Sequence, residues 1–266
     1  MHNFFIYLRL IKISLLAQME YRLSFILQSS SQFLLLSAEF AAVWILFVRF
    51  RHIRGWHLFH ICVFYGLISI SFSICDALTC GFDKMPLLIR KGDLDRYLLR
   101  PCNLIWQILG YELSLRRIGR FSQGLLVLLI GFHNLSLEWT VIKGFIIILA
   151  VIGSVCLFSG ILFIQGTISF WTTESLEIMN TLTYGGIEAG QFPITIYTPA
   201  FQKFFTYAVP LACVNYFPVV FILDKKDILG TSRMFQALSP CFGLLFLLAG
   251  ILFFYYGIRH YTSTGT

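Results

Sequence analysis

The sequence predicts an all-α integral membrane protein with six transmembrane helices, an N-terminal amphipathic interfacial helix and short cytoplasmic helices between spans two and three. Three observations predict this class. The 266 residues are 58% hydrophobic and only 12% charged, against about 25% charged in an ordinary soluble domain. Six spans of about 20 residues fit this length. The chain has 20 Lys and Arg but only 13 Asp and Glu. The basic residues lie in short runs between apolar segments, which indicates membrane topology rather than nucleic acid binding.

The apolar segments follow one another without a tandem repeat, a low-complexity tract or a flexible linker, so residues 1–266 are predicted to form a single transmembrane domain. The fourth segment, about 30 residues long, is long enough to tilt in a bilayer. Pro210 and Pro218 predict that the fifth is kinked or broken. A cytoplasmic helix and an irregular loop are expected over 171–202. The predicted spans are 24–48, 57–80, 118–137, 141–171, 204–223 and 240–258.

The first twenty residues are predicted to form a basic amphipathic helix on the cytoplasmic membrane surface. Arg9 and Lys12 interrupt the apolar pattern, whereas a cleaved signal peptide requires an uninterrupted apolar region. Apolar residues at helical spacing between Leu8 and Leu16 fall on the side opposite these two charges. Such a helix lies in the interface and contacts membrane lipid.

The distribution of Lys and Arg predicts that both termini lie in the cytoplasm, because the cytoplasmic loops of multi-pass proteins carry the excess of basic residues. With the N-terminus inside, 13 of these residues fall inside and 7 outside. The main exception is the run from Arg49 to Arg54. The inside set is Arg9, Lys12, Arg22, Lys84, Arg90, Lys91, Arg96, Arg100, Arg116, Arg117, Arg120, Lys203 and Arg259. The outside set is Arg49, Arg51, Arg54, Lys143, Lys225, Lys226 and Arg233.

The longest densely charged stretch runs from Gly81 to Asn103, between the second and third spans. Asp83 is a candidate N-cap for one short helix, and Asp93 for a second helix that ends before Pro101. Gly92 separates the two. The charged and apolar residues that these helices expose are typical of a protein docking surface. A solvated loop that rests on lipid headgroups is the alternative.

Polar residues inside the predicted spans are the candidates for an intramembrane polar lining: Glu39, Asp76 and Asn215. Ionisable groups at this depth are costly and often functional. An interhelical hydrogen bond or ion pair is the competing interpretation, and it is the favoured one for Asp76.

No metal site is predicted. The seven cysteines form no C-x-x-C pair and lie mostly in apolar segments, where they act as small apolar residues. His52, His57 and His60 lie close together at the outer membrane edge and invite comparison with membrane oxygenases. Those enzymes need several histidine boxes to hold two irons, and this chain has six histidines in all.

The run GDLDRYLLRP from Gly92 to Pro101 resembles the signature of the membrane subunits of type-2 ATP-binding cassette (ABC) exporters, in the branch of six-span permeases. Further segments resemble the same family in the same order and extend the resemblance over essentially the whole chain. His57 departs from the pattern, which has a small polar residue there. The further segments are Met19–Arg22, Ile53–Trp56, Val209–Pro218 and the C-terminal GIRHYTSTG.

This resemblance implies a permease subunit that makes half of a transport pathway in the plasma (inner) membrane and couples ATP hydrolysis on a separate subunit to outward translocation. The chain contains no G-x-x-x-x-G-K-[ST] sequence, the loop that cradles phosphates in ATPases of that class. Two ATPase subunits, carrying ATP and magnesium, and a second permease, identical or related, are the implied partners. The residues expected to couple to the ATPase are Asp93, Asp95, Arg96, Tyr97, Leu98 and Arg100.

Two other functions fit the composition. A membrane enzyme acting on a lipid-linked substrate would use Asp76, Asp93 and Asp95 as acids, but no basic phosphate clamp accompanies them. A secondary transporter would show internal symmetry and broken helices in corresponding halves, whereas only the fifth span is predicted to be broken.

Overall fold

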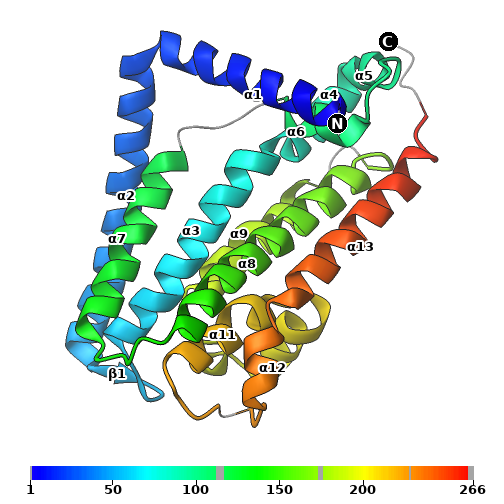
Figure 1. Ribbon diagram of the computed structural model, residues 1–266. Coiled ribbons are helices and arrows are strands. Elements are labelled where there is room, and N and C mark those ends of the chain that lie inside the picture. Colours follow the sequence, from blue (N-terminus) through cyan, green and yellow to red (C-terminus); the bar gives the residue numbers. More distant parts are fainter. Residues whose placement is uncertain (1, 112–116, 173–175, 228, 263–266) are drawn as a thin grey trace.

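The computed structural model describes residues 2–111, 117–172, 176–227 and 229–262. Long helices run side by side between two ends of the molecule, and short helices lie at those ends (Figure 1). One end carries α1, α4, α5 and α6, and we call it the α5 end. The other carries the only two strands of the described residues, β1 (His52–Ile53) and β2 (Trp56–His57), which pair as an antiparallel hairpin. We call it the hairpin end.

The centre of the bundle is α3 (Leu58–Asp83), which is buried without interruption from Ile61 to Ser73. It packs against α7 (Ile118–Asn134) on one side and α8 (Val141–Ile168) on the other. Two helices complete the bundle: α2 (Arg22–Phe50) lies along α7, and α13 (Cys241–Ile258) lies along α8.

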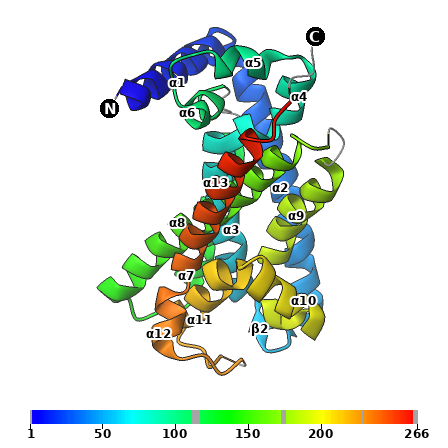
Figure 2. The ribbon, with the colours of Figure 1, turned by 90° about the vertical axis from the view of Figure 1, so that its right-hand side faces the viewer.

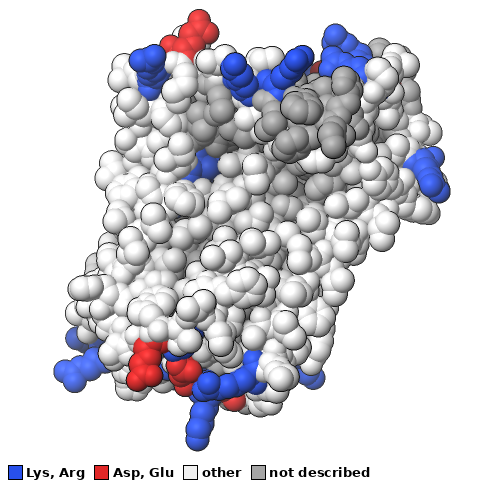
Figure 3. All heavy atoms as spheres, viewed as in Figure 1, with Lys and Arg blue, Asp and Glu red and all other residues white. Residues whose placement is uncertain are grey.

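Four of the described helices are long and apolar enough to cross a membrane: α2, α3, α8 and α13. The bent segment 199–222 is a fifth candidate if it counts as one span. Charged side chains gather toward the two ends of the face shown in Figure 3, with a largely uncharged band between them. The helices and this band are those of an all-α membrane protein.

The segment predicted as the fifth span does not run the length of the bundle. Its helical parts are α10 (Pro199–Lys203), η3 (Phe204–Ala208), η4 (Ala212–Tyr216) and α11 (Phe217–Ile222), and the chain bends by 85° between the first pair and the second. Pro210, which lacks an N–H, lies at this break as predicted. Both ends of the segment lie at the hairpin end (Figures 1 and 2), as in a re-entrant loop. Lys203, expected inside, therefore lies with the outside set.

The helix that runs along the bundle in this part of the chain is α9 (Leu176–Gly190), which contacts α8 and α3. The sequence predicted a helix within 171–202, and α9 is that helix, but it packs in the bundle instead of lying outside it. Met179, Thr183 and Ile187 are buried in the bundle. The helix has only 15 residues and includes Glu188. Its composition alone therefore does not identify it as part of the bundle.

The N-terminal helix α1 (His2–Glu20) lies across the α5 end, at a large angle to α2 (Figure 1). The ring of Tyr7 contacts that of Trp106 in α6 (Leu104–Leu109), with centroids 5.3 Å apart. Arg9 and Lys12 are exposed. Arg116 of the basic set and the end of the C-terminal motif, from 263 on, lie outside the described residues.

Glycines allow α8 and α13 to approach closely. A Cβ atom at Gly243 would overlap the carbonyl oxygen of Gly153, and one at Gly250 would lie 2.9 Å from the carbonyl oxygen of Gly160. Small residues at such crossings allow backbone contact between membrane helices, where the hydrophobic effect supplies no driving force.

We expect Gly243→Leu to separate α8 from α13 and to lower the unfolding temperature in detergent, because the new side chain has no space between the backbones. The matched control is Gly144→Leu, in α8, where a Cβ atom would meet nothing within 4 Å. Equal unfolding temperatures for the two variants would contradict this packing.

Candidate functional site

Two short helices follow α3 at the α5 end, as the sequence predicted: α4 (Met85–Arg90), with Pro86 in its first turn, and α5 (Asp93–Leu98). Gly92 joins them with a φ of 70°, a conformation that glycine adopts without steric cost. The predicted caps differ. Asp83 is the last residue of α3 and accepts a hydrogen bond from Gln165 Nε2 at 2.9 Å. Asp93 lies in the first turn of α5, after the N-cap Gly92.

The two helices have opposite exposure. In α4, Met85, Leu88 and Ile89 are buried, and Met85 approaches Gly166 of α8. In α5 only Leu94 is buried. Helix α4 is therefore a base fixed to the bundle, and α5 projects from it.

The six predicted coupling residues all lie on or next to α5. Arg96, Leu98 and Arg100 are exposed, and Asp93, Asp95 and Tyr97 are partly buried. Leu99, which the sequence analysis did not select, is 86% exposed. The surface formed by Asp93–Arg100 is called the α5 surface below.

The α5 surface is joined to the long helices through α4, which contacts α5 on one side and α3 and α8 on the other. Next to α4, the ring of Phe82 at the end of α3 meets that of Phe163 of α8 in a tilted arrangement, at 3.9 Å between centroids, and that of Phe254 of α13 at 5.2 Å. Burial and the carboxylate of Asp95 raise the pKa of Tyr261, which follows α13, to about 12. Tyr261 also contacts Phe170, with centroids 5.6 Å apart. Helix α5 is therefore connected to α3 and α8 through α4, and to the segment after α13 through Asp95.

A second contact holds the C-terminal side of α5. Gln107 of α6 is 4% exposed and donates from Nε2 to the carbonyl oxygens of Tyr97 at 3.1 Å and Cys102 at 3.0 Å. The sequence analysis gave no role to Gln107, Phe82 or Tyr261, because none is charged and the C-terminal motif that contains Tyr261 does not indicate what its side chain contacts. Only their positions in the fold show the role.

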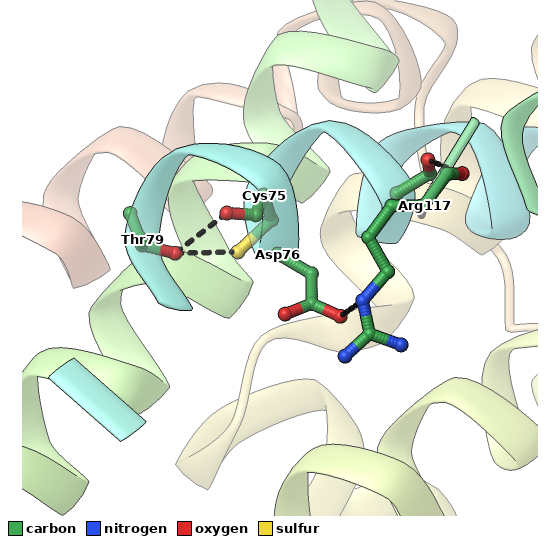
Figure 4. A network of polar contacts seen from close by, with 5 residues as sticks. Cys75, Asp76, Thr79 and Arg117 are labelled. Atoms are coloured by element: carbon green, nitrogen blue, oxygen red, sulfur yellow. Dashed lines mark hydrogen bonds and ion pairs between the residues drawn. The ribbon is translucent and has the colours of Figure 1, made fainter. Parts of the chain in front are cut away.

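Asp76 forms an ion pair with Arg117, at 2.5 Å between Oδ2 and Nε (Figure 4). The two side chains are 9% and 17% exposed. Ser73 Oγ also donates to the carbonyl oxygen of Arg117 at 2.8 Å. The pair joins α3 to the start of α7, which is the structural interpretation favoured for Asp76.

The other two candidate lining residues differ from each other. Asn215 is 2% exposed, and its Nδ2 donates to the carbonyl oxygen of Gly190, so it joins the re-entrant segment to α9. Glu39 is exposed near the middle of α2. Its charge interacts with that of Glu188, an exposed residue of α9 that the sequence analysis did not place in the membrane.

The hairpin end is closed by contacts between distant segments. Arg54 Nη1 donates to the carbonyl oxygen of Thr195 at 2.7 Å, and Trp56 Nε1 donates to Thr195 Oγ1 at 3.2 Å. Lys225 donates to the carbonyl oxygen of Gly55 at 3.0 Å and lies over the Trp56 ring. Within the described ranges no group of three His, Cys, Asp or Glu side chains is arranged to hold a metal ion.

The fold and the α5 surface define a class: a multi-pass membrane protein with a charged helix projecting from one end of its bundle. The family model described as ABC-2 family transporter protein matches residues 33–265. The chain therefore belongs to the ABC-2 family of transporters, as its sequence motifs indicated. It is a transport component of the membrane rather than the ATPase of an ABC transporter. None of the curated proteins and none of the solved structures compared with the chain matches it.

We expect Asp76→Asn to destabilise the protein by about 3–5 kcal/mol, because it leaves a guanidinium without its charge partner in a poorly solvated site. Thermal unfolding in detergent measures the effect. The double variant Asp76→Asn with Arg117→Gln removes both charges and should lose less than Asp76→Asn alone. A single variant as stable as the native protein would contradict the ion pair.

Proposed function

We propose that this chain is the permease subunit of an ABC exporter, in which ATP hydrolysis on a separate ATPase subunit drives translocation through the membrane bundle. The observation that carries the proposal is the α5 surface, which projects from the bundle but is connected to α3 and α8 through α4 and to Tyr261, after α13, through Asp95. Family membership makes an ATPase subunit the expected partner of this surface. ATP and magnesium belong to that partner, and this chain binds no cofactor.

The proposed assembly contains two ATPase subunits and a second permease, identical or related. When ATP draws the ATPases together, the two α5 surfaces follow them. Because α4 contacts α5, α3 and α8, and Phe82 beside it packs against α8 and α13, the displacement reaches the spans and opens the pathway outward. Asp93, Asp95, Arg96 and Arg100 are the proposed polar contacts, and Tyr97 and Leu98 the apolar ones.

We place the chain in the plasma (inner) membrane with both termini and the α5 end in the cytoplasm and α1 in contact with lipid headgroups. The excess of Lys and Arg at the α5 end supports this orientation. Lys203 is an exception, because it lies at the hairpin end with the residues expected outside. In this arrangement α2, α3, α7, α8, α9 and α13 make six crossings, and the bent segment enters and leaves at the outer face.

Glu39 is the proposed polar lining of the pathway. Three polar residues precede Glu39 on the same side of α2: Ser24, Gln28 and Gln32. Successive residues of this group are four residues apart, and Gln32 is seven residues before Glu39, which is the spacing of one helical face. This polar stripe lies beside the buried stripe of Leu36 and Phe40. A carboxylate at this depth does not face hydrocarbon, so the stripe lines water or another subunit.

By contrast, no observation favours the lipid-linked enzyme, because its acid Asp76 is held by Arg117.

Co-purification from membranes in mild detergent tests the proposed function. The native chain should retain an ATPase subunit, and the double change Asp93→Lys with Arg96→Glu should lose it. The two new side chains still attract each other, so α5 remains intact while its charge pattern is reversed. Arg259→Glu reverses a charge at the same end outside α5 and should keep the ATPase. If the native chain retains no ATPase, the proposal is wrong.

Cysteine accessibility tests the lining. In a variant without its native cysteines, we expect Glu39→Cys to react with a membrane-impermeant maleimide, because water reaches this side of α2. Leu34→Cys is the control on the same helix, since Leu34 is 66% exposed and lies on the apolar side of α2. Equal labelling at the two positions would contradict the proposal that Glu39 lines the pathway.

A further inference from the structure

The α5 surface contains a small polar pocket with a volume of about 170 Å³, lined by Asp93, Arg96, Tyr97 and Arg100. Pockets for small molecules usually measure about 300–1,000 Å³, so this one is of the size of a single side chain. It lies at the end of the molecule, where α5 projects beyond the long helices (Figure 2).

The charges around the pocket do not balance. Arg96 Nη1 lies 3.5 Å from Asp93 Oδ1, and the Arg96 side chain is 77% exposed, so this pair is weak and easily exchanged. The guanidinium of Arg100 lies over the ring of Tyr97, 5.0 Å from its centroid. Two guanidinium groups and one carboxylate leave a net positive charge, which favours an anion.

The geometry also indicates which anion. Arg96 lies in α5 and Arg100 lies two residues after its end, and both line the same pocket together with Tyr97. Guanidinium groups bind carboxylates through paired hydrogen bonds. Leu98 and Leu99, exposed next to the pocket, supply the apolar contacts that surround such a pair in a protein interface. This combination matches a protein surface rather than a free ion.

We propose that the pocket receives the carboxylate of one Asp or Glu side chain of the ATPase subunit, held between Arg96 and Arg100. The inference rests on the proposed function and makes it more specific. On binding, the incoming carboxylate replaces Asp93 as the partner of Arg96. The contact thus joins the ATPase to the segment that Gln107 and Tyr261 hold against the bundle.

Zero-length cross-linking of the native complex tests this proposal. In Arg96→Lys and Arg100→Lys the charge remains and an amine takes the place of each guanidinium. A carbodiimide then joins that amine to a carboxylate in direct contact, and mass spectrometry of the peptides identifies it. We expect a cross-link to one Asp or Glu of the ATPase. Arg90→Lys, exposed on α4 and outside the pocket, is the control and should give none.

A binding measurement completes the test. Arg96→Glu with Arg100→Glu should reduce ATPase recovery at least tenfold, and reversing the cross-linked acid to Arg should restore it. If the ATPase co-purifies with this double variant as with the native chain, the pocket is not its contact and the proposed function survives. Loss of binding to anionic vesicles alone would assign the pocket to lipid and overturn the proposal. If the native chain carries no ATPase, both proposals are wrong.

Discussion

Polar groups cannot be left facing hydrocarbon, and the arrangement of this bundle follows from that constraint. Asp76 is held by Arg117, and Asn215 donates to the backbone of Gly190. Gln165, 1% exposed in α8, donates to Asp83. Each of these contacts joins segments that are distant in sequence, so the polar residues of the spans fix which helices are neighbours. Glu39 differs because it is exposed on α2, and this exposure is the reason for our proposal that its side of the bundle faces water or another subunit.

The bundle also fixes the position of the short helix α5. A six-residue helix is not stable alone in water, so α5 depends on α4 and α6 for its position. Met85 and Ile89 hold α4 to the bundle, and Gln107 holds the end of α5. Buried α4 and exposed α5 divide one segment into a part that is fixed to the bundle and a part that is accessible to a partner, as the proposed coupling to an ATPase subunit requires.

The sequence predicted the features that depend on composition and on local signals. Long apolar segments gave the limits of α2, α8 and α13 to within a few residues, and Gly92 and Pro101 marked the ends of α5. A helix was predicted in the segment that contains α9, but its place in the bundle was not, because α9 is short and contains Glu188. After Pro210 the chain returns to the hairpin end. This could not be predicted either, because a broken span and a re-entrant loop have the same composition. The partner of Asp76 lies on another helix, and one sequence does not pair them.

The central claim is that α5 moves as one body with the long helices when the ATPase binds ATP. Spin labels at Leu99→Cys and Thr172→Cys, in a cysteine-free variant of the complex, measure the distance from α5 to the end of α8. The account predicts that this distance is the same without nucleotide and with ATP trapped, while the distance between the α5 surfaces of the two permeases decreases. A change in the distance within one chain would mean that α5 pivots independently of the bundle, which would contradict the account.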